Sequence, residues 1–408
     1  MLTTPVRRRN AAGMAHTITA PRGLAGVVVT DTTIGRVRGR EGFYHYRQYS
    51  AIELAERRTL EDVWALLIDG ALPDDAKPLQ REIAPLRHIP PAVAAALPGI
   101  AAASGSQDPM GGLRAALAVA GLAAGARPLY DTSPAQRRAH AMALCALTPS
   151  LLAALYRLRA GLAPIESRDD LSHAANYLYM ITGEEPSQPH ARAIERYLIA
   201  TVDHGFNAST FTARVIASTG ADIYACVGGA LGALSGPLHG GAPSRALDTL
   251  DAIGSIDRAG SWLRSRILNG ERIMGFGHPI YRTEDPRSRM LKGIAQDLGG
   301  ELVDFAVAVE ERVLSLLAEL KPGRELHTNV EYYAGVVMHL CGLPREMFTP
   351  TFATSRVIGW CANVLEQAED PKIIRPDSRY VGPRPPQPLP GERAAPIAGG
   401  GRPLLAES

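Results

Sequence analysis

Three side chains suited to proton transfer lie in short segments where the backbone can approach a ligand. They are His239 in Gly-Pro-Leu-His-Gly-Gly, His278 in Gly-Phe-Gly-His, and Glu331 in Asn-Val-Glu-Tyr-Tyr. Histidine and glutamate can donate and accept protons near neutral pH. Neighbouring glycines lack Cβ atoms, so a small substrate can come close to the backbone. The three segments together predict acid–base chemistry on a small, tightly held substrate.

Four other histidines have weaker contexts. A single histidine near glycine is more often a turn residue than a catalytic one. We interpret His173, His190, His327 and His339 as structural or exposed, with His327 ambiguous because it lies four residues before Glu331.

The composition is that of an ordinary globular protein with room for two domains. Of 408 residues, 46% are hydrophobic and 21% charged, and the net charge is +2. This charge gives no indication of nucleic-acid binding. The cysteines, Cys145, Cys226, Cys341 and Cys361, show no C-x-x-C pair. We therefore expect no zinc site and no disulfide framework, and free thiols in a reducing cytoplasm.

The pattern along the chain predicts mostly helices. The apolar runs Val27–Val29 and Phe43–Tyr46 favour a small β-hairpin near the N-terminus. Thr59–Gly70 has a capping hydroxyl at its start and a glycine at its end, as expected for a helix. The small residues of Ala225–Leu234 predict a buried helix that another helix, at a subunit interface or within the chain, can approach closely.

One apolar stretch, Ala139–Tyr156, approaches the length of a membrane span. Pro149 interrupts it, so we predict two soluble helices that meet there and no membrane segment. Residues 1–20 contain Arg7–Arg9 but no apolar core for a targeting signal, and we expect an untargeted extension.

The segments around His239 and His278 resemble the two active-site loops of the citrate synthase family. Similar segments follow in the family's order over roughly residues 23–382, and they are Asp203–Arg214, Asp285-Pro-Arg, Phe348-Thr-Pro, Ser355–Trp360 and Ile374–Pro376. The resemblance implies an all-α fold of two helical domains with the active site between them, preceded by the small hairpin.

Mapped on this chain, the resemblance and the composition predict five segments. They are a disordered extension (1–20), the first part of the large helical domain (21–242), the small helical domain (243–343), the return to the large domain (344–382) and a disordered Pro/Gly-rich tail (383–408).

The implied reaction joins the methyl carbon of acetyl-CoA to the ketone carbon of oxaloacetate, and the resulting citryl thioester is then hydrolysed. A thioester methyl is a weak carbon acid, so a carboxylate must take its proton while donors stabilise the thioester oxygen. Glu331 matches the base and His239 the donor. His278 matches the donor to the ketone oxygen, and His204 a further oxaloacetate contact. A helix N-terminus after His239 favours its neutral form.

The resemblance also assigns the binding residues. Arg287, Arg356 and Arg375 match carboxylate-binding arginines, for which a planar guanidinium is well suited. Arg375 is expected to complete the site of the partner in a homodimer. The CoA-binding residues implied are Arg272, Ile273, Met274, Gly275, Phe276 and Gly277 for the adenine, Arg282 for a phosphate, and the weaker phosphate candidates Lys321 and Arg324.

Glu331 departs from the family, in which this position is usually Asp. The longer side chain moves the carboxylate, and a misplacement of about 1 Å can cost on the order of 10²-fold in rate. We favour a compensated active enzyme, citrate synthase in the cytoplasm with acetyl-CoA as co-substrate and no metal or other cofactor. The alternatives are 2-methylcitrate synthase acting on propionyl-CoA, and a non-catalytic paralogue that binds acyl-CoA or oxaloacetate.

Overall fold

The computed structural model describes residues 18–105, 108–237, 239, 243–277, 280–281, 283–387 and 390. Internal contacts divide the chain into two units, residues 1–372 and 373–408. The described residues of the second unit form neither helix nor strand. His278, Arg282 and most of the two predicted terminal extensions lie outside the described residues. The predicted boundaries of the large and small domains stay a prediction.

The first unit begins with a small antiparallel sheet of three strands in the order β1-β2-β3. The strands are β1 (Gly35–Arg38), β2 (Phe43–Tyr46) and β3 (Tyr49–Ser50). Tyr44 and Tyr46 are buried on one face, and their hydroxyls donate to the carbonyls of Ala200 at 2.9 Å and Ile199 at 2.8 Å. These bonds attach the sheet to the C-terminal end of the helix Gln188–Thr201.

The expected hairpin was therefore wrong in its first strand. Val27–Val29 is not a strand, and its central side chain, Val28, is 82% exposed. The strand that pairs with Phe43–Tyr46 is Gly35–Arg38, in the segment predicted to connect the two strands. β-branched residues favour strands only where their side chains find a surface to pack on, and Val28 has none.

The described chain is otherwise mainly helical, as predicted. Eleven α-helices form the first group: α1 (Ala51–Arg57), α2 (Leu60–Asp69), α3 (Lys77–Ile83), α4 (Pro91–Ser104), α5 (Pro109–Ala123), α6 (Pro134–Arg159), α7 (His173–Thr182), α8 (Gln188–Thr201), α9 (Ala208–Ala217), α10 (Ile223–Leu234) and α16 (Phe348–Gln367). Short 3₁₀ helices are η1 (Arg22–Leu24), η2 (Pro85–Arg87), η3 (Leu129–Asp131) and η4 (Arg345–Met347).

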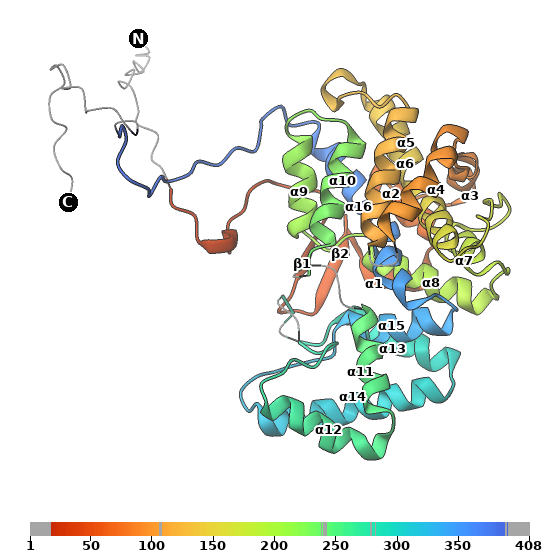
Figure 1. Cartoon of the computed structure of the whole chain (residues 1–408), viewed down its shortest axis with the longest axis vertical. Helices are drawn as coiled ribbons and strands as arrows, with labels where there is room; N and C mark the ends of the chain where they lie inside the picture. Colours follow the sequence, from red (N-terminus) through yellow and green to blue (C-terminus); the bar gives the residue numbers. More distant parts are fainter. Residues whose placement is uncertain are drawn as a thin grey trace, which may run out of the picture. The chain divides into compact units, whose positions relative to one another are not determined.

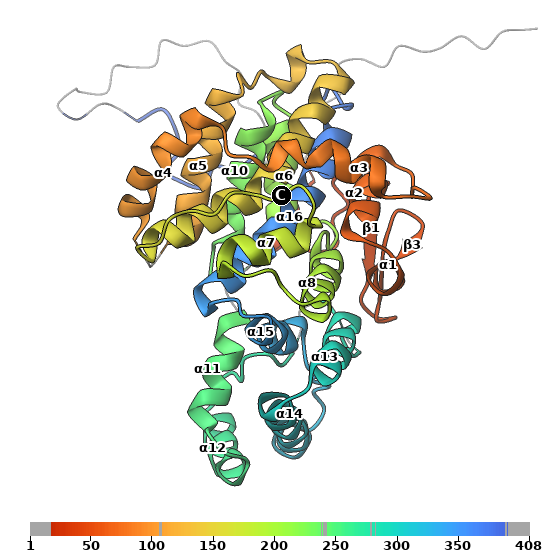
Figure 2. The ribbon, with the colours of Figure 1, turned by 90° about the vertical axis from the view of Figure 1, so that its right-hand side faces the viewer.

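Five further helices form a second group at one end of the first unit (Figures 1 and 2). They are α11 (Pro243–Ile253), α12 (Ile256–Leu268), α13 (Pro286–Leu298), α14 (Glu301–Leu320) and α15 (Val330–Leu340). Within this group α15 packs against α11 and α13, and α12 packs against α14. The two groups meet where α8 contacts α13 and α15, and where α16 contacts α11.

The helix predicted at Thr59–Gly70 is confirmed as α2. The Thr59 hydroxyl accepts from the Asp62 amide at 3.2 Å, and the Asp62 carboxylate accepts from the Thr59 amide at 3.1 Å. This reciprocal pair is a capping box. Gly70 ends the helix with a φ of +84°, where a residue without Cβ is favoured.

The predicted break at Pro149 was wrong, because α6 is one continuous helix. Proline has no N–H, so the carbonyl four residues earlier, that of Cys145, loses its helical donor. Burial outweighs this cost, since every residue from Cys145 to Leu155 is buried. Within the described chain α6 is the one helix long and apolar enough to span a membrane, but 78% of its apolar window is buried inside the protein.

Helix α16 passes through the centre of the first group, and most of its residues are buried. A helix that is buried on all sides must satisfy its polar side chains internally. Accordingly, Asn363 donates to the carbonyl of Gly359 at 2.9 Å, and the Ser355 hydroxyl donates to the carbonyl of Leu198 at 2.6 Å. This central helix also carries Arg356, one of the predicted binding residues.

Candidate active site

A cavity of about 1870 Å³ is lined by residues from both helix groups. It brings together most of the residues predicted from the sequence. Those that line it are His204, His239, Arg272, Ile273, Met274, Gly275, Phe276, Gly277, Arg287, Lys321, Arg324, Glu331 and Arg356. His278 and Arg282 lie outside the described residues, and Arg375 belongs to the second unit.

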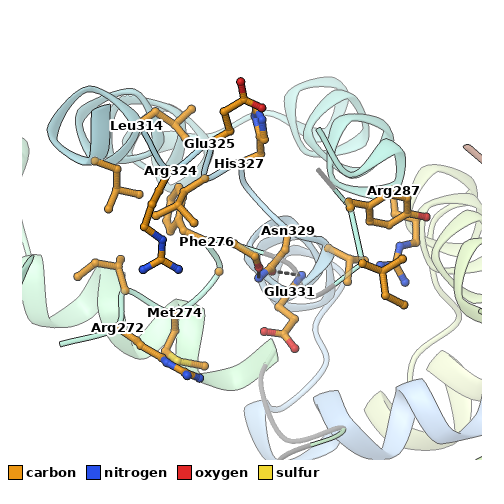
Figure 3. A pocket seen from close by; sticks show the side chains of 18 of the residues that line it. Arg272, Met274, Phe276, Arg287, Leu314, Arg324, Glu325, His327, Asn329 and Glu331 are labelled. Carbon is orange, nitrogen blue, oxygen red and sulfur yellow. Dashed lines mark hydrogen bonds between the residues drawn. The ribbon is translucent and has the colours of Figure 1, made fainter. Parts of the chain in front are cut away.

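Glu331 lies in the first turn of α15, and its side chain extends into the cavity (Figure 3). Asn329 caps this helix, because its Oδ1 accepts from the Glu331 amide at 3.0 Å. The nitrogen of the Asn329 side chain, Nδ2, donates to the carbonyl of Gly277 at 2.9 Å. A carboxylate in the first turn also interacts favourably with the positive end of the helix dipole.

The loop 275–277 is held against the segment that precedes α15. The backbone amide of Asn329 donates to the carbonyl of Gly275 at 2.9 Å, and the backbone amide of Gly277 donates to the carbonyl of His327 at 2.8 Å. Gly275 has a φ of +88°, and a Cβ there would lie 2.8 Å from the ring of Tyr332. The close approach of this loop to α15 therefore requires glycine.

His239 is partly buried and its protonation state follows from its contacts. Its Nε2 lies 3.2 Å from the backbone amide of Ser209 and 2.9 Å from the Ser209 hydroxyl. A backbone amide can only donate, so Nε2 is the acceptor and the ring proton is on Nδ1. Burial, together with the charge of Arg356, lowers the pKa of His239. The geometry thus favours a neutral imidazole with Nδ1–H as its donor.

This result refines the expectation for His239. A helix does follow His239, beginning at Pro243, and burial and the charge of Arg356 also lower the pKa of this imidazole. Ser209 is itself fixed on two sides: its hydroxyl donates to Asn207 Oδ1 at 2.7 Å and accepts from Trp360 Nε1 at 3.2 Å.

Arg287 is 3% exposed and forms a forked ion pair with the buried Asp285. Its Nε lies 3.0 Å from Asp285 Oδ1, and its Nη2 lies 2.8 Å from Oδ2. Burial lowers the pKa of Arg287, but the adjacent Asp285 carboxylate outweighs this effect and the pKa is raised. The guanidinium therefore stays charged at the cavity wall, where it can meet an anionic ligand.

Arg356 is equally buried, but a backbone carbonyl and an aromatic ring contact it. Its Nε donates to the carbonyl of Thr201 at 2.9 Å, and its guanidinium lies 4.6 Å from the centre of the Phe352 ring. Burial lowers its pKa, while Asp203 partly restores it. A buried cation at a cavity wall is stabilised by a bound anion, so this residue favours a carboxylate ligand.

His204 lies beside these arginines on the wall of the cavity. Its Nε2 is 3.0 Å from the Tyr281 hydroxyl, and its ring meets the Tyr44 ring edge-on at 5.4 Å. Both neighbours are buried. The imidazole is therefore held in one orientation before any ligand binds.

A second set of cations lies on the opposite side of Glu331 from Arg287. Figure 3 shows Arg272 and Arg324 on this side. Lys321 and His327 line the same cavity. Our interpretation of His327 as structural or exposed is thus incomplete: its carbonyl holds the loop at Gly277 and its side chain also faces the cavity. His173, by contrast, is buried against Trp64, away from the residues that line the cavity.

The comparison with known families decides the identity of the chain. A family model described as citrate synthase, C-terminal domain, matches residues 23–377. The chain belongs to the citrate synthase family. A citrate synthase from Deinococcus radiodurans is 35% identical over 366 residues, which cover 89% of this chain and 96% of that protein. A putative citrate synthase 2 from Mycobacterium tuberculosis is 39% identical over 90% of this chain and 94% of its own length.

Solved structures agree with this assignment. The crystal structure of citrate synthase from Thermotoga maritima is 36% identical, with a TM-score of 0.76, and covers 90% of this chain and 96% of that chain. A citrate synthase from Thermoplasma acidophilum, described as a ternary complex with carboxymethyl coenzyme A and oxaloacetate, is 27% identical to this chain, with a TM-score of 0.82. The match covers 90% of this chain and 98% of that chain. The fold is therefore the all-α fold of these enzymes.

Several residues that shape the site were not identified from the sequence. Asn207 and Asn329 cap the helices that lead to Ser209 and Glu331, and Tyr281 orients His204. Asparagine before a helical run is a recognisable capping signal, so the two caps could have been found. The contact of Ser209 with His239 joins residues 30 positions apart and leaves no local signal.

Proposed function

We propose that the chain condenses acetyl-CoA with oxaloacetate and hydrolyses the citryl thioester to citrate and CoA. One observation carries this proposal: a carboxylate, a neutral imidazole and two buried guanidinium groups line a single cavity in a chain of the citrate synthase family. The related protein from Thermoplasma acidophilum, described as a complex with carboxymethyl coenzyme A and oxaloacetate, supports the same two ligands here.

In this proposal Glu331 removes a proton from the methyl group of acetyl-CoA. The Nδ1–H of His239 donates to the thioester oxygen, where negative charge develops as the C–H bond breaks. A neutral imidazole is a suitable donor, because its remaining ring proton is acidic enough to share but does not add a buried charge. The resulting enol carbon attacks the ketone of oxaloacetate, and His278 donates to the oxygen that becomes the alcohol.

Arg287 and Arg356 bind the carboxylates of oxaloacetate, with His204 as a further contact. Both guanidinium groups are buried and oriented, by Asp285 and Thr201 respectively. Charge-assisted hydrogen bonds to such fixed donors are the strong class of hydrogen bond. On the other side of Glu331, the loop 272–277 holds the adenine of CoA, and Arg282, Lys321 and Arg324 contact its phosphates.

We also propose a homodimer in which Arg375 completes the oxaloacetate site of the partner, and a cytoplasmic location. The likeness of Ile374-Arg-Pro376 to the family segment supports the shared site of the dimer. The scattered cysteines, without a C-x-x-C pair, support the reducing cytoplasm. Glu331, in the place usually held by Asp, is treated as a working base because Asn329 caps its helix and the loop at Gly275 packs closely against the following turn.

Steady-state turnover with acetyl-CoA and with propionyl-CoA, each with oxaloacetate, tests the proposal. CoA release is followed by thiol titration. We expect a higher kcat/KM for acetyl-CoA. One methylene group in an apolar pocket is worth about 1–3 kcal/mol, so a preference of roughly tenfold or more is measurable. A preference for propionyl-CoA would indicate 2-methylcitrate synthase, and no turnover with either would indicate a binding paralogue.

A further inference from the structure

A single buried carboxylate connects the predicted oxaloacetate side of the cavity to the helix that carries Glu331. Asp285 is 1% exposed and accepts four hydrogen bonds from described residues. Three come from Arg287, through its amide, Nε and Nη2. The fourth comes from the backbone amide of Val330, which lies 3.3 Å from Oδ2. Oδ2 is thus shared between the guanidinium of Arg287 and the first residue of α15.

Each of these contacts has a local reason. Asp285 is the N-cap of α13, and Val330 is the first residue of α15, so the amino-terminal ends of two helices meet at this carboxylate. Helix N-termini carry unpaired amides and a partial positive charge, and a carboxylate stabilises both. A carboxylate so placed can fix the position of two helices relative to each other.

From this geometry we infer that Asp285 is a positioning residue, which fixes the positions of Arg287 and Glu331 relative to each other. Arg287 cannot shift without moving Oδ2, and Oδ2 holds the amide of Val330, the residue next to Glu331. The substrate carboxylate bound by Arg287 and the base that takes the methyl proton are therefore fixed relative to each other. This inference rests on the proposed function, because it assigns both of those roles.

Two variants test the two links. Asp285→Asn keeps the helix cap through its remaining oxygen, because Asn caps helices about as well as Asp, but it places an NH2 donor where Oδ2 accepts from Arg287 and Val330, so it breaks both links. Val330→Pro breaks the Val330 link alone, because it replaces the amide hydrogen that Asp285 accepts with a ring carbon and leaves the contacts between Asp285 and Arg287 in place. Proline is well tolerated at the first position of a helix, and Asn329 before it already has the extended backbone that proline favours, with φ −101° and ψ 173°. Val330→Ala is the matched control, since it shortens the side chain but keeps the amide hydrogen.

The measurements are kcat, the KM for oxaloacetate and the melting temperature. We expect Asp285→Asn to raise the KM for oxaloacetate at least about tenfold and to lower kcat at least about tenfold, because a misplacement near 1 Å costs on the order of 10²-fold. We expect Val330→Pro to lower kcat at least about fivefold relative to Val330→Ala, with KM within about twofold. Glu284→Gln, an exposed carboxylate that pairs with exposed Arg289 at 3.4 Å, should match the wild type.

The outcomes distinguish this inference from the proposed function. An active wild type with inactive Glu331→Gln supports the proposed function on its own. If Asp285→Asn then matches Glu284→Gln, or if Val330→Pro matches Val330→Ala, Asp285 does not link the two groups and the inference is overturned. A wild type that neither binds oxaloacetate nor turns over refutes the proposed function, and the inference with it.

Discussion

Gly275→Ala is the perturbation whose effect follows most directly from the geometry of the site. The added Cβ would lie 2.8 Å from Cδ2 and 3.0 Å from Cβ of Tyr332. Tyr332 cannot move aside easily, because its ring is fully buried and its hydroxyl donates to the carbonyl of Ala306 at 2.8 Å. The loop must therefore shift away from α15, and the hydrogen bonds of Gly275 and Gly277 to residues 327–329 must lengthen.

The cost has two parts. Placing a residue with a Cβ at a φ of +88° costs roughly 1–2 kcal/mol. Overpacking against a fixed side chain adds about 1–3 kcal/mol. Gly161→Ala is the matched control: its φ is +73°, and its Cβ would meet nothing within 4 Å, so it bears the first cost without the second. We expect Gly275→Ala to lose about 2–5 kcal/mol of unfolding free energy, and the control about 1–2 kcal/mol.

Urea denaturation and steady-state turnover test this prediction together. A loop displaced by several tenths of an ångström to about 1 Å should lower kcat/KM by roughly 10- to 100-fold, whereas Gly161→Ala should turn over like the wild type. Equal stability of the two variants, or wild-type turnover of Gly275→Ala, would refute the close packing of the loop on α15 as a requirement of the site.

Two further predictions concern His239 and Arg375. His239→Ala should lower kcat by at least about 10²-fold, the range for losing an oxyanion donor, without unfolding the chain. Because the pKa of His239 is lowered, its neutral form persists below pH 6.5, so the acid limb of kcat/KM that His239 controls should lie below that pH. A limb above pH 6.5 that disappears in His239→Asn would contradict the neutral donor. Mixing inactive Arg375→Ala and Glu331→Ala chains should restore some activity through hybrid dimers, and no recovery after demonstrated subunit exchange would argue against a shared site.

The sequence predicts the parts of this fold that depend on neighbouring residues. The cap at Thr59, the stop at Gly70 and the helix at Ile223–Leu234 all follow from local composition and spacing. The first strand and the break at Pro149 were wrong because packing decided them. Val28 has no surface to cover it, and the surroundings of Pro149 bury the whole of α6.

The candidate site was predictable in its residues but not in its connections. The loops around His239 and Glu331 have recognisable patterns, and the structure brings them to one cavity. The contacts that fix them join residues far apart in sequence: Ser209 with His239, and Asp285 with Val330, 45 positions later. Periodicity and capping rules describe local structure, so they carry no information about such pairs.

Glu331→Gln is the variant that tests the central claim most directly. Glutamine keeps the size of the side chain and its hydrogen-bonding capacity but removes its basicity. If Glu331 takes the methyl proton of acetyl-CoA, this variant should lose turnover while it still binds oxaloacetate, measured by calorimetry, through Arg287 and Arg356. Glu331→Asp should also lower kcat, because the shorter carboxylate would not reach the methyl group. Unchanged turnover in Glu331→Gln would remove this residue from the mechanism and contradict the account.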